Sequence, residues 1–427
     1  MYKITKLNNG AQVATLSVGG AHSVSIGVWV GTGSRYEPEP LSGISHFFEH
    51  MVFKGTKNRS YLEIKQSIEG RGGTLNAFTS EEVTCLLAKV LSSHAHGAID
   101  VLLDMLFNPL LRDEDLEKER RVIYEEIKMY VDLPQHRAYE GLLKLLWPRH
   151  PLGRNIIGDF KTLKNISREQ LIKYRQRNCG WNNVLIAGCG KITHTNMVKY
   201  VKDFIRKNKF PQDKQAKLEY KPITCRPKRP KAKFIIKDTK QSHICLGVPA
   251  LRRTDPKRYA ASFLHIILGA NMSSRLFNKV REEKGLAYEI STAVKRLKDT
   301  GAFVIHAGVV SEKVEQALAV ILNELKQISK KTVRIDEFKR AREYYIGQLM
   351  MGLEDNADHM AWLAESLMHY GRVRSIKQVI AQINKVKIKD LTTVARMIFK
   401  KKNLNLSVIG PLTKEQKKGL LRILNSF

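Results

Sequence analysis

Two histidines and a glutamate stand close together in the segment HFFEH, which runs from His46 to His50. If this segment is helical, His46 and His50 occupy positions i and i+4 on one face, with Cβ atoms about 5 to 6 Å apart. Glu49 follows His46 by three residues and lies on the same side. Two imidazoles on one face can bind zinc, and a neighbouring carboxylate can accept a proton from water. The segment therefore predicts a zinc-dependent hydrolytic site.

A catalytic zinc ion needs a third protein ligand, which leaves a fourth position for water. On the amphipathic helix predicted over Leu116–Met129, the candidates are Glu119, Glu125 and Glu126. Glu119 and Glu126 are two turns apart and share a face, whereas Glu125 points about 100° away. Periodicity alone does not decide which of them binds the metal, and a solvated position is the ordinary role of a glutamate on such a helix.

One pattern of elements occurs twice along the chain. A strand at Ala21–Val30 precedes the HFFEH helix, and a strand at Gln241–Ala250 precedes a second helix with the sequence SFLHI. The helix Leu116–Met129 has a counterpart at Phe338–Met351, and corresponding positions lie about 220 residues apart. This repetition predicts an α+β fold of two homologous halves, each with a mainly antiparallel sheet and helices packed on it.

The two halves are expected to differ in chemistry. Residues 207–233 contain four prolines and many basic side chains, which is typical of a linker between a metal-binding half, 1–206, and a second half, 234–427. The second half has other residue types at the positions that correspond to His46, Glu49, His50, Glu119 and Glu126. These are Ser262, His265, Ile266, Ala341 and Gln348. The second half is therefore predicted to bind no metal.

Composition restricts the remaining functional classes. The 427 residues include 73 Lys and Arg against 41 Asp and Glu, a net charge of +32 that suggests anionic partners. No zinc finger, helix-turn-helix, ribonucleoprotein motif or Gly-Lys phosphate loop accompanies the charge, so we expect no nucleic-acid binding. The five cysteines are scattered and predict neither a disulfide framework nor a Cys-rich zinc module.

The apolar segments predict no passage through a membrane. No run of about 18 apolar residues occurs, and the N-terminal residues lack the apolar core of a secretory signal. We expect a cytoplasmic location in a bacterium, or an organelle matrix if the chain is a mature form.

Several segments together resemble the pitrilysin family of zinc peptidases, whose H-x-x-E-H order reverses that of other zinc peptidases. The resemblance is closer to the β subunit of mitochondrial processing peptidase and its short bacterial relatives, and it covers almost the whole chain. The segments that carry it are HFFEHMVFKGT, GGTLNAFTS, ERRVIYEEIKM, HPLGRNIIG and SSRLFNKVREEKGLAY.

The resemblance implies roles for individual residues. In this family the third ligand follows the second histidine by about 76 residues, which implies that Glu126 binds the metal and that Glu119 supports the site from outside it. Glu49 is implied to be the general base. Arg281 and Tyr288 match the pair that the second half brings to the substrate. The strand residues implied to bind substrate are Asn76, Ala77 and Phe78.

These residues predict a zinc endopeptidase with one Zn²⁺ per chain, which hydrolyses peptides in a chamber between two halves that close like a clam shell. The competing function is a metal-free structural subunit, which the family also contains; the presence of all four chemical residues favours the enzyme. Short members of the family pair, so we expect a homodimer or a heterodimer with a related subunit.

Overall fold

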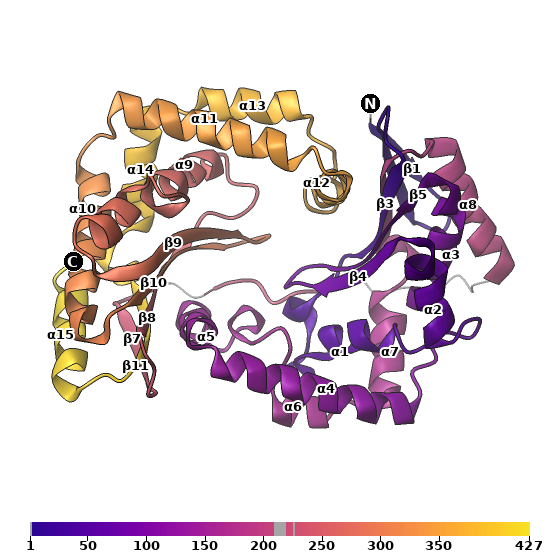
Figure 1. Ribbon diagram of the computed structural model, residues 1–427, viewed down its shortest axis with the longest axis horizontal. Coiled ribbons are helices and arrows are strands. Elements are labelled where there is room, and N and C mark those ends of the chain that lie inside the picture. Colours follow the sequence, from indigo (N-terminus) through magenta and orange to yellow (C-terminus); the bar gives the residue numbers. More distant parts are fainter. Residues whose placement is uncertain (1, 209–218, 225–226) are drawn as a thin grey trace. The chain divides into compact units, whose positions relative to one another are not determined.

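The computed structural model describes residues 2–208, 219–224 and 227–427, so part of the predicted linker 207–233 lies outside the described residues. Two mixed sheets and the helices around them make up an α+β fold, as the sequence predicts (Figure 1). The described cysteines, which are Cys85, Cys179, Cys189 and Cys245, are free. Within the described residues, no helix is both long enough and apolar enough to cross a membrane.

The first sheet has the strand order β1-β2-β6-β3-β5-β4. Its strands are β1 (Tyr2–Lys6), β2 (Gln12–Ser17), β3 (Ser23–Val30), β4 (Thr74–Thr79), β5 (Thr84–Leu91) and β6 (Val184–Gly190). All neighbouring pairs are antiparallel except β2 and β6. The helices of this chain half are α1 (Ile44–Met51), α2 (Tyr61–Ile68), α3 (Ala95–Phe107), α4 (Asp113–Asp132), α5 (Pro134–Leu146), α6 (Phe160–Lys164), α7 (Arg168–Asn178) and α8 (His194–Asn208).

The second sheet repeats this plan with the order β7-β11-β8-β10-β9. Its strands are β7 (Lys231–Ile236), β8 (Ser242–Ala250), β9 (Ala287–Arg296), β10 (Gly301–Val309) and β11 (Asn405–Gly410). Here too one pair, β7 and β11, is parallel, at the place that β2 and β6 occupy in the first sheet. The helices are α9 (Arg258–Gly269), α10 (Val314–Lys330), α11 (Ile335–Gly352), α12 (Asn356–Tyr370), α13 (Ile376–Lys385), α14 (Ile388–Ile398) and α15 (Lys414–Asn425). The shared order and the shared parallel pair agree with duplication.

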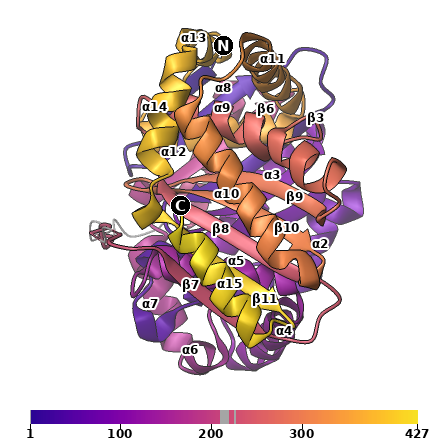
Figure 2. The same cartoon turned by 90° about the vertical axis from the view of Figure 1, so that its left-hand side faces the viewer.

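Each compact unit combines most of one chain half with one helix from the other half. The first unit consists of residues 1–127, 155–221 and 350–374, and the second of 128–154, 222–349 and 375–427. Helix α12 thereby packs on the first sheet, and α5 packs on the second. Figure 2 shows α10 and α14 on the face of the second sheet that is turned toward the viewer. The exchanged helices supply part of each hydrophobic core.

Glycines allow both exchanged helices to approach their sheets closely. A Cβ at Gly27 in β3 would lie 2.5 Å from Nε1 of Trp29 and 2.7 Å from Sδ of Met360 in α12. At Gly247 in β8, a Cβ would lie 2.8 Å from the side chain of Leu142 in α5. All three distances are shorter than real Cβ contacts, so a side chain at either glycine would displace the neighbouring side chains in the core.

Replacing Gly27 with alanine tests this close approach. We expect Gly27→Ala to lower the free energy of unfolding by about 1–3 kcal/mol, because the added methyl overpacks the core between Trp29 and Met360. The matched control is Gly19→Ala, since no atom lies within 4 Å of a Cβ placed there. Denaturant unfolding measures both, and equal stability of the two variants would contradict the packing argument.

Candidate metal centre

Helix α1 presents the HFFEH residues, and a buried carboxylate fixes where this helix begins. Oε2 of Glu37 accepts a hydrogen bond from the amide of Gly43 at 2.8 Å, and Oε1 accepts one from the amide of Ser45 at 2.9 Å. These bonds satisfy amides that a helix N-terminus otherwise leaves unpaired, and the negative charge suits the positive end of the helix dipole. Gly43 adopts a φ of +96°, a conformation that favours glycine.

His46, His50 and Glu126 lie close together. The Nε2 atoms of His46 and His50 lie 3.8 Å and 3.7 Å from Oε2 of Glu126, which belongs to α4. One ligand atom from each residue lies within 4.8 Å of the other two. Bonds of about 2.0–2.2 Å in tetrahedral geometry separate ligand atoms by roughly 3.3–3.6 Å, so a small closure would fit a zinc ion. Two imidazole nitrogens and one carboxylate oxygen are also a ligand set that catalytic zinc uses.

Burial favours the neutral form of both a histidine and the glutamate of this set. Burial, and then the neighbouring His50, lower the pKa of His46 to about 3, so the imidazole is neutral at neutral pH. Burial also raises the pKa of Glu126, an effect that the nearby His50 opposes. A bound divalent cation would favour the ionised carboxylate and so counteract the effect of burial.

The outer nitrogens of the two histidines have different surroundings. Nδ1 of His50 lies 3.0 Å from Oε2 of Glu119, whereas Nδ1 of His46 is buried and has no hydrogen-bond partner in the described part of the chain. Glu119 is only 5% exposed and also forms an ion pair with Lys54. Burial acts to raise the pKa of Glu119, but the hydrogen bonds from His50 and Lys54 outweigh it, so the pKa is lowered.

Glu49 lies beside the ligands and is held by an edge strand of the first sheet. The hydroxyl of Thr79, the last residue of β4, donates a 2.5 Å hydrogen bond to Oε2 of Glu49. Burial raises the pKa of Glu49; Thr79 and His50 oppose this increase, and Glu126 adds to it. Glu125, the remaining glutamate on this stretch of α4, is exposed.

The three predicted substrate residues form part of the edge strand β4. The amide of Ala77 donates to Oδ1 of Asn76, its own neighbour, at 2.8 Å, so this amide does not take part in the ladder with β5. Phe78 is 38% exposed, and its ring packs edge to face on Trp29 with centroids 5.5 Å apart. The strand therefore offers an amide donor at an open edge.

Arg281 and Tyr288 lie together in the second unit. Arg281 belongs to a short π-helical segment, η7 (Phe277–Glu282), and Tyr288 follows it at the start of β9. The guanidinium carbon of Arg281 is 5.5 Å from the centroid of the Tyr288 ring and 4.7 Å from that of Phe277. The Tyr288 side chain is 74% exposed.

In the second half, the residues that correspond to His46 and Glu49 form hydrogen bonds with neighbouring hydroxyl groups. Nδ1 of His265, which corresponds to Glu49, lies 2.7 Å from the hydroxyl of Thr292, and burial lowers the pKa of His265 to about 4. Ser262, which corresponds to His46, contacts the Tyr345 hydroxyl at 3.0 Å. Among the described residues, the single group of three or more potential metal ligands is that of His46, His50 and Glu126.

Thr79, Lys54 and Glu37 were not identified from the sequence. Thr79 follows Phe78 in the segment TLNAFTS, and Lys54 belongs to the segment HFFEHMVFKGT, but neither position has a periodic signal that marks a contact with the site. Each contact depends on which elements pack together, which local spacing does not reveal.

Comparison with known proteins identifies the family of this chain. The family model "Insulinase (Peptidase family M16)" matches residues 12–159, and the model "Peptidase M16 inactive domain" matches residues 165–345. The protein named uncharacterized zinc protease YmxG, from Bacillus subtilis, is 33% identical over 414 residues, covering 96% of this chain and 98% of its own. An uncharacterized zinc protease from Mycobacterium tuberculosis is 33% identical over 407 residues, covering 95% and 92%.

Solved structures share the fold. A protease from Helicobacter pylori superposes with a TM-score of 0.90 at 21% identity and covers 96% of this chain and 99% of its own. A Pseudomonas fluorescens structure titled as a peptidase M16 inactive domain gives a TM-score of 0.88 at 18% identity, covering 96% and 98%. With relatives that are a third identical over nearly the full length, the chain belongs to the insulinase family of zinc peptidases, M16, which is the pitrilysin family that its sequence resembles.

Proposed function

We propose that this peptidase is a zinc-dependent endopeptidase, which hydrolyses peptides or unfolded segments in an enclosed chamber. The observation that carries the proposal is the convergence of His46, His50 and Glu126, with ligand atoms within 4.8 Å of one another and Glu49 on the same helix as the histidines. When bound there, zinc would lower the pKa of a water molecule from about 15.7 toward about 7 and polarise the scissile carbonyl.

Glu49 is proposed as the general base. Thr79 engages Oε2, which leaves Oε1 to take a proton from water as the water oxygen bonds to the carbonyl carbon. The same carboxyl then gives this proton to the amide nitrogen as the C–N bond breaks. The raised pKa of Glu49 supports this role, because a base that must also act as an acid works best when its pKa lies nearer neutral pH.

Strand β4 is proposed to hold the substrate in an extended conformation. A peptide carbonyl that displaced the side chain of Asn76 would accept the amide hydrogen of Ala77 and add a strand to the open edge of the sheet. Phe78, partly exposed, would contact a substrate side chain. Arg281 and Tyr288 are proposed to stabilise the oxyanion from the second unit, and this role requires the halves to close on the peptide. Pairing as a homodimer or heterodimer also stays a prediction.

Zinc binding by the three ligands is directly testable. We expect a chelator to abolish peptide hydrolysis, and His50→Ala and Glu126→Gln each to lose most of the bound zinc, because two ligands hold the ion poorly. Metal analysis of the purified variants measures this. Glu125→Gln is the matched control on α4, since Glu125 is exposed and should leave the zinc content unchanged. A full complement of zinc in His50→Ala would show that the ligand set is wrong.

The base is tested separately from the metal. We expect Glu49→Gln to lower kcat by about 10²–10⁴-fold, because the amide keeps the shape of the carboxylate but cannot take the proton. Zinc content should remain that of the unmodified protein. Steady-state kinetics with a fluorogenic peptide give kcat, and a value close to that of the unmodified enzyme with zinc bound would exclude Glu49 as the base.

Substrate addition to β4 predicts an effect of losing one amide. Ala77→Pro removes the outward-facing N–H at an edge strand, where proline is tolerated. We expect KM to rise about tenfold, which corresponds to one hydrogen bond of roughly 1–1.5 kcal/mol. Ala77→Gly retains the N–H and is the control. If the two variants have the same KM, the peptide does not use this amide.

A further inference from the structure

Glu119 is a buried carboxylate that lies between a metal ligand and a lysine. One of its oxygens, Oε2, accepts a hydrogen bond from Nδ1 of His50 at 3.0 Å, and the other, Oε1, forms an ion pair with Nζ of Lys54. The two contacts therefore use different oxygens of one carboxylate. A carboxylate held at both oxygens cannot rotate about its last bond, so the position of Lys54 determines the orientation that Glu119 presents to His50.

The backbone around Lys54 is held in place by the chain that follows α3. A guanidinium nitrogen of Arg112 donates to the carbonyl of Lys54 at 3.3 Å, and the amide of Leu110 donates to the carbonyl of Gly55 at 3.1 Å. On the same segment, the amide of Lys57 donates to the carbonyl of Asn108 at 3.0 Å. Gly55 has a φ of +119°, which lets the chain turn directly after Lys54.

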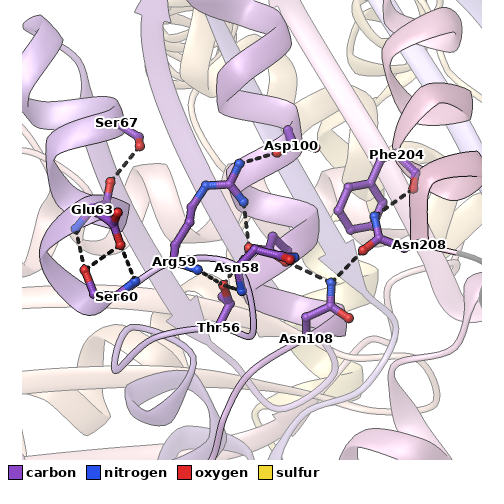
Figure 3. Close-up of polar contacts among 11 residues, drawn as sticks. Thr56, Asn58, Arg59, Ser60, Glu63, Ser67, Asp100, Asn108, Phe204 and Asn208 are labelled. Carbon is purple, nitrogen blue, oxygen red and sulfur yellow. Dashed lines mark hydrogen bonds and ion pairs between the residues drawn. The ribbon is translucent and has the colours of Figure 1, made fainter.

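A second buried acid, Asp104 of α3, holds the rest of this segment. Its side chain is fully buried and accepts hydrogen bonds from four side chains, which we call the Asp104 cluster: Thr56 at 2.6 Å, Asn58 at 2.7 Å, Arg59 at 2.6 Å and Asn108 at 2.8 Å. Figure 3 shows Thr56, Asn58 and Arg59 gathered around these contacts, and Arg59 also reaching Asp100. A fully buried charge with satisfied partners is costly to rearrange, so the segment from Thr56 to Arg59 is firmly fixed to α3.

We infer that Lys54 is a positioning residue of the proposed zinc site. Lys54 orients the carboxylate of Glu119, and this carboxylate accepts a hydrogen bond from Nδ1 of His50, so that Nε2 of His50 points toward the metal position. The inference rests on the ligand set proposed above. Lys54 touches neither substrate nor metal ligand itself; its effect passes through Glu119. The Asp104 cluster supports this role because it holds the segment from Thr56 to Arg59, which follows Lys54 closely in the chain. Since Nδ1 of His46 has no hydrogen-bond partner among the described residues, this chain of contacts fixes one of the two proposed histidine ligands and not the other.

Zinc affinity, measured by competition with a chromophoric chelator on the full-length protein, is the readout. We expect Lys54→Met to weaken zinc binding about tenfold, within the 10–100-fold range for lost partners of metal ligands. Lys54→Arg keeps the positive charge, so we expect it to weaken zinc binding less than about threefold. Lys57→Met removes an exposed lysine of the same segment and should bind zinc as tightly as the unmodified protein.

A double-mutant cycle shows whether the effect passes through Glu119. In a Glu119→Gln background, adding Lys54→Met should change zinc affinity less than threefold, because the carboxylate that Lys54 orients is already gone. This pair also carries no unpaired buried charge, so it provides the comparison even if Lys54→Met alone folds poorly. A tenfold loss in both backgrounds would overturn the route through Glu119.

Two outcomes separate this inference from the proposed function. If His50→Ala retains zinc, the ligand set is wrong, and the proposed function fails together with the role of Lys54. If His50→Ala loses zinc while Lys54→Met and Lys57→Met bind it equally well, the ligand set stands and Lys54 is not a positioning residue.

Discussion

The imidazole of His50 contacts two glutamates of α4 through its two nitrogens, and this arrangement constrains how α1 and α4 pack. Nε2 of His50 faces Glu126 at 3.7 Å, and its Nδ1 faces Glu119 at 3.0 Å. Both glutamates belong to α4, so α1 and α4 must keep a fixed register with respect to each other. A shift of α4 by a single residue would turn both carboxylates by about 100° and remove them from the histidine together. The packing of these two helices is thus as important to the metal centre as the identity of its ligands.

Duplication gives five strands of each sheet the same order, with β1 added to the first sheet. It also places glycines at corresponding points of β3 and β8, where α12 and α5 approach. The helices cross reciprocally: each half of the chain contributes one helix to the core built on the other half's sheet. Trp29 and Cys85 on the first sheet are covered by Met360 and Leu363 of α12. A hydrophobic core completed from both halves couples their folding, because neither sheet can bury its apolar face with its own chain half alone.

The strongly patterned features were predictable from the sequence. The spacing of His46, Glu49 and His50 requires only the 3.6-residue period of a helix, and the repeat appears in the order of strands and helices. Periodicity left Glu119, Glu125 and Glu126 undecided, and the family resemblance implied Glu126. The Nε2 atoms of both histidines lie within 3.8 Å of its carboxylate. The sequence pattern did not predict that α5 packs on the second sheet and α12 on the first. An amphipathic helix shows which of its faces is apolar, but not which sheet will cover that face.

The second half, in which the described residues form no cluster of potential metal ligands, clarifies the role of Thr79. In the first unit, Glu49 of α1 accepts a hydrogen bond from Thr79 on the edge strand β4. In the second unit, His265, the residue that corresponds to Glu49, makes a 2.7 Å contact with Thr292 on the edge strand β9. A link from α1 or α9 to the edge strand of the same unit is therefore present in both units. Within the part of the chain that the structure describes, the ligand cluster occurs in the first unit alone.

A contact that exists without the metal cluster has a structural basis of its own. It fixes the helix against the edge strand by satisfying two polar groups that the packing would otherwise bury unpaired. In the first unit the same bond has a chemical consequence, because the strand it holds is the one proposed to bind substrate. One hydrogen bond would then position both the proposed general base, Glu49, and the strand proposed to bind the peptide. The corresponding contact in the second unit has no ligand cluster beside it among the described residues.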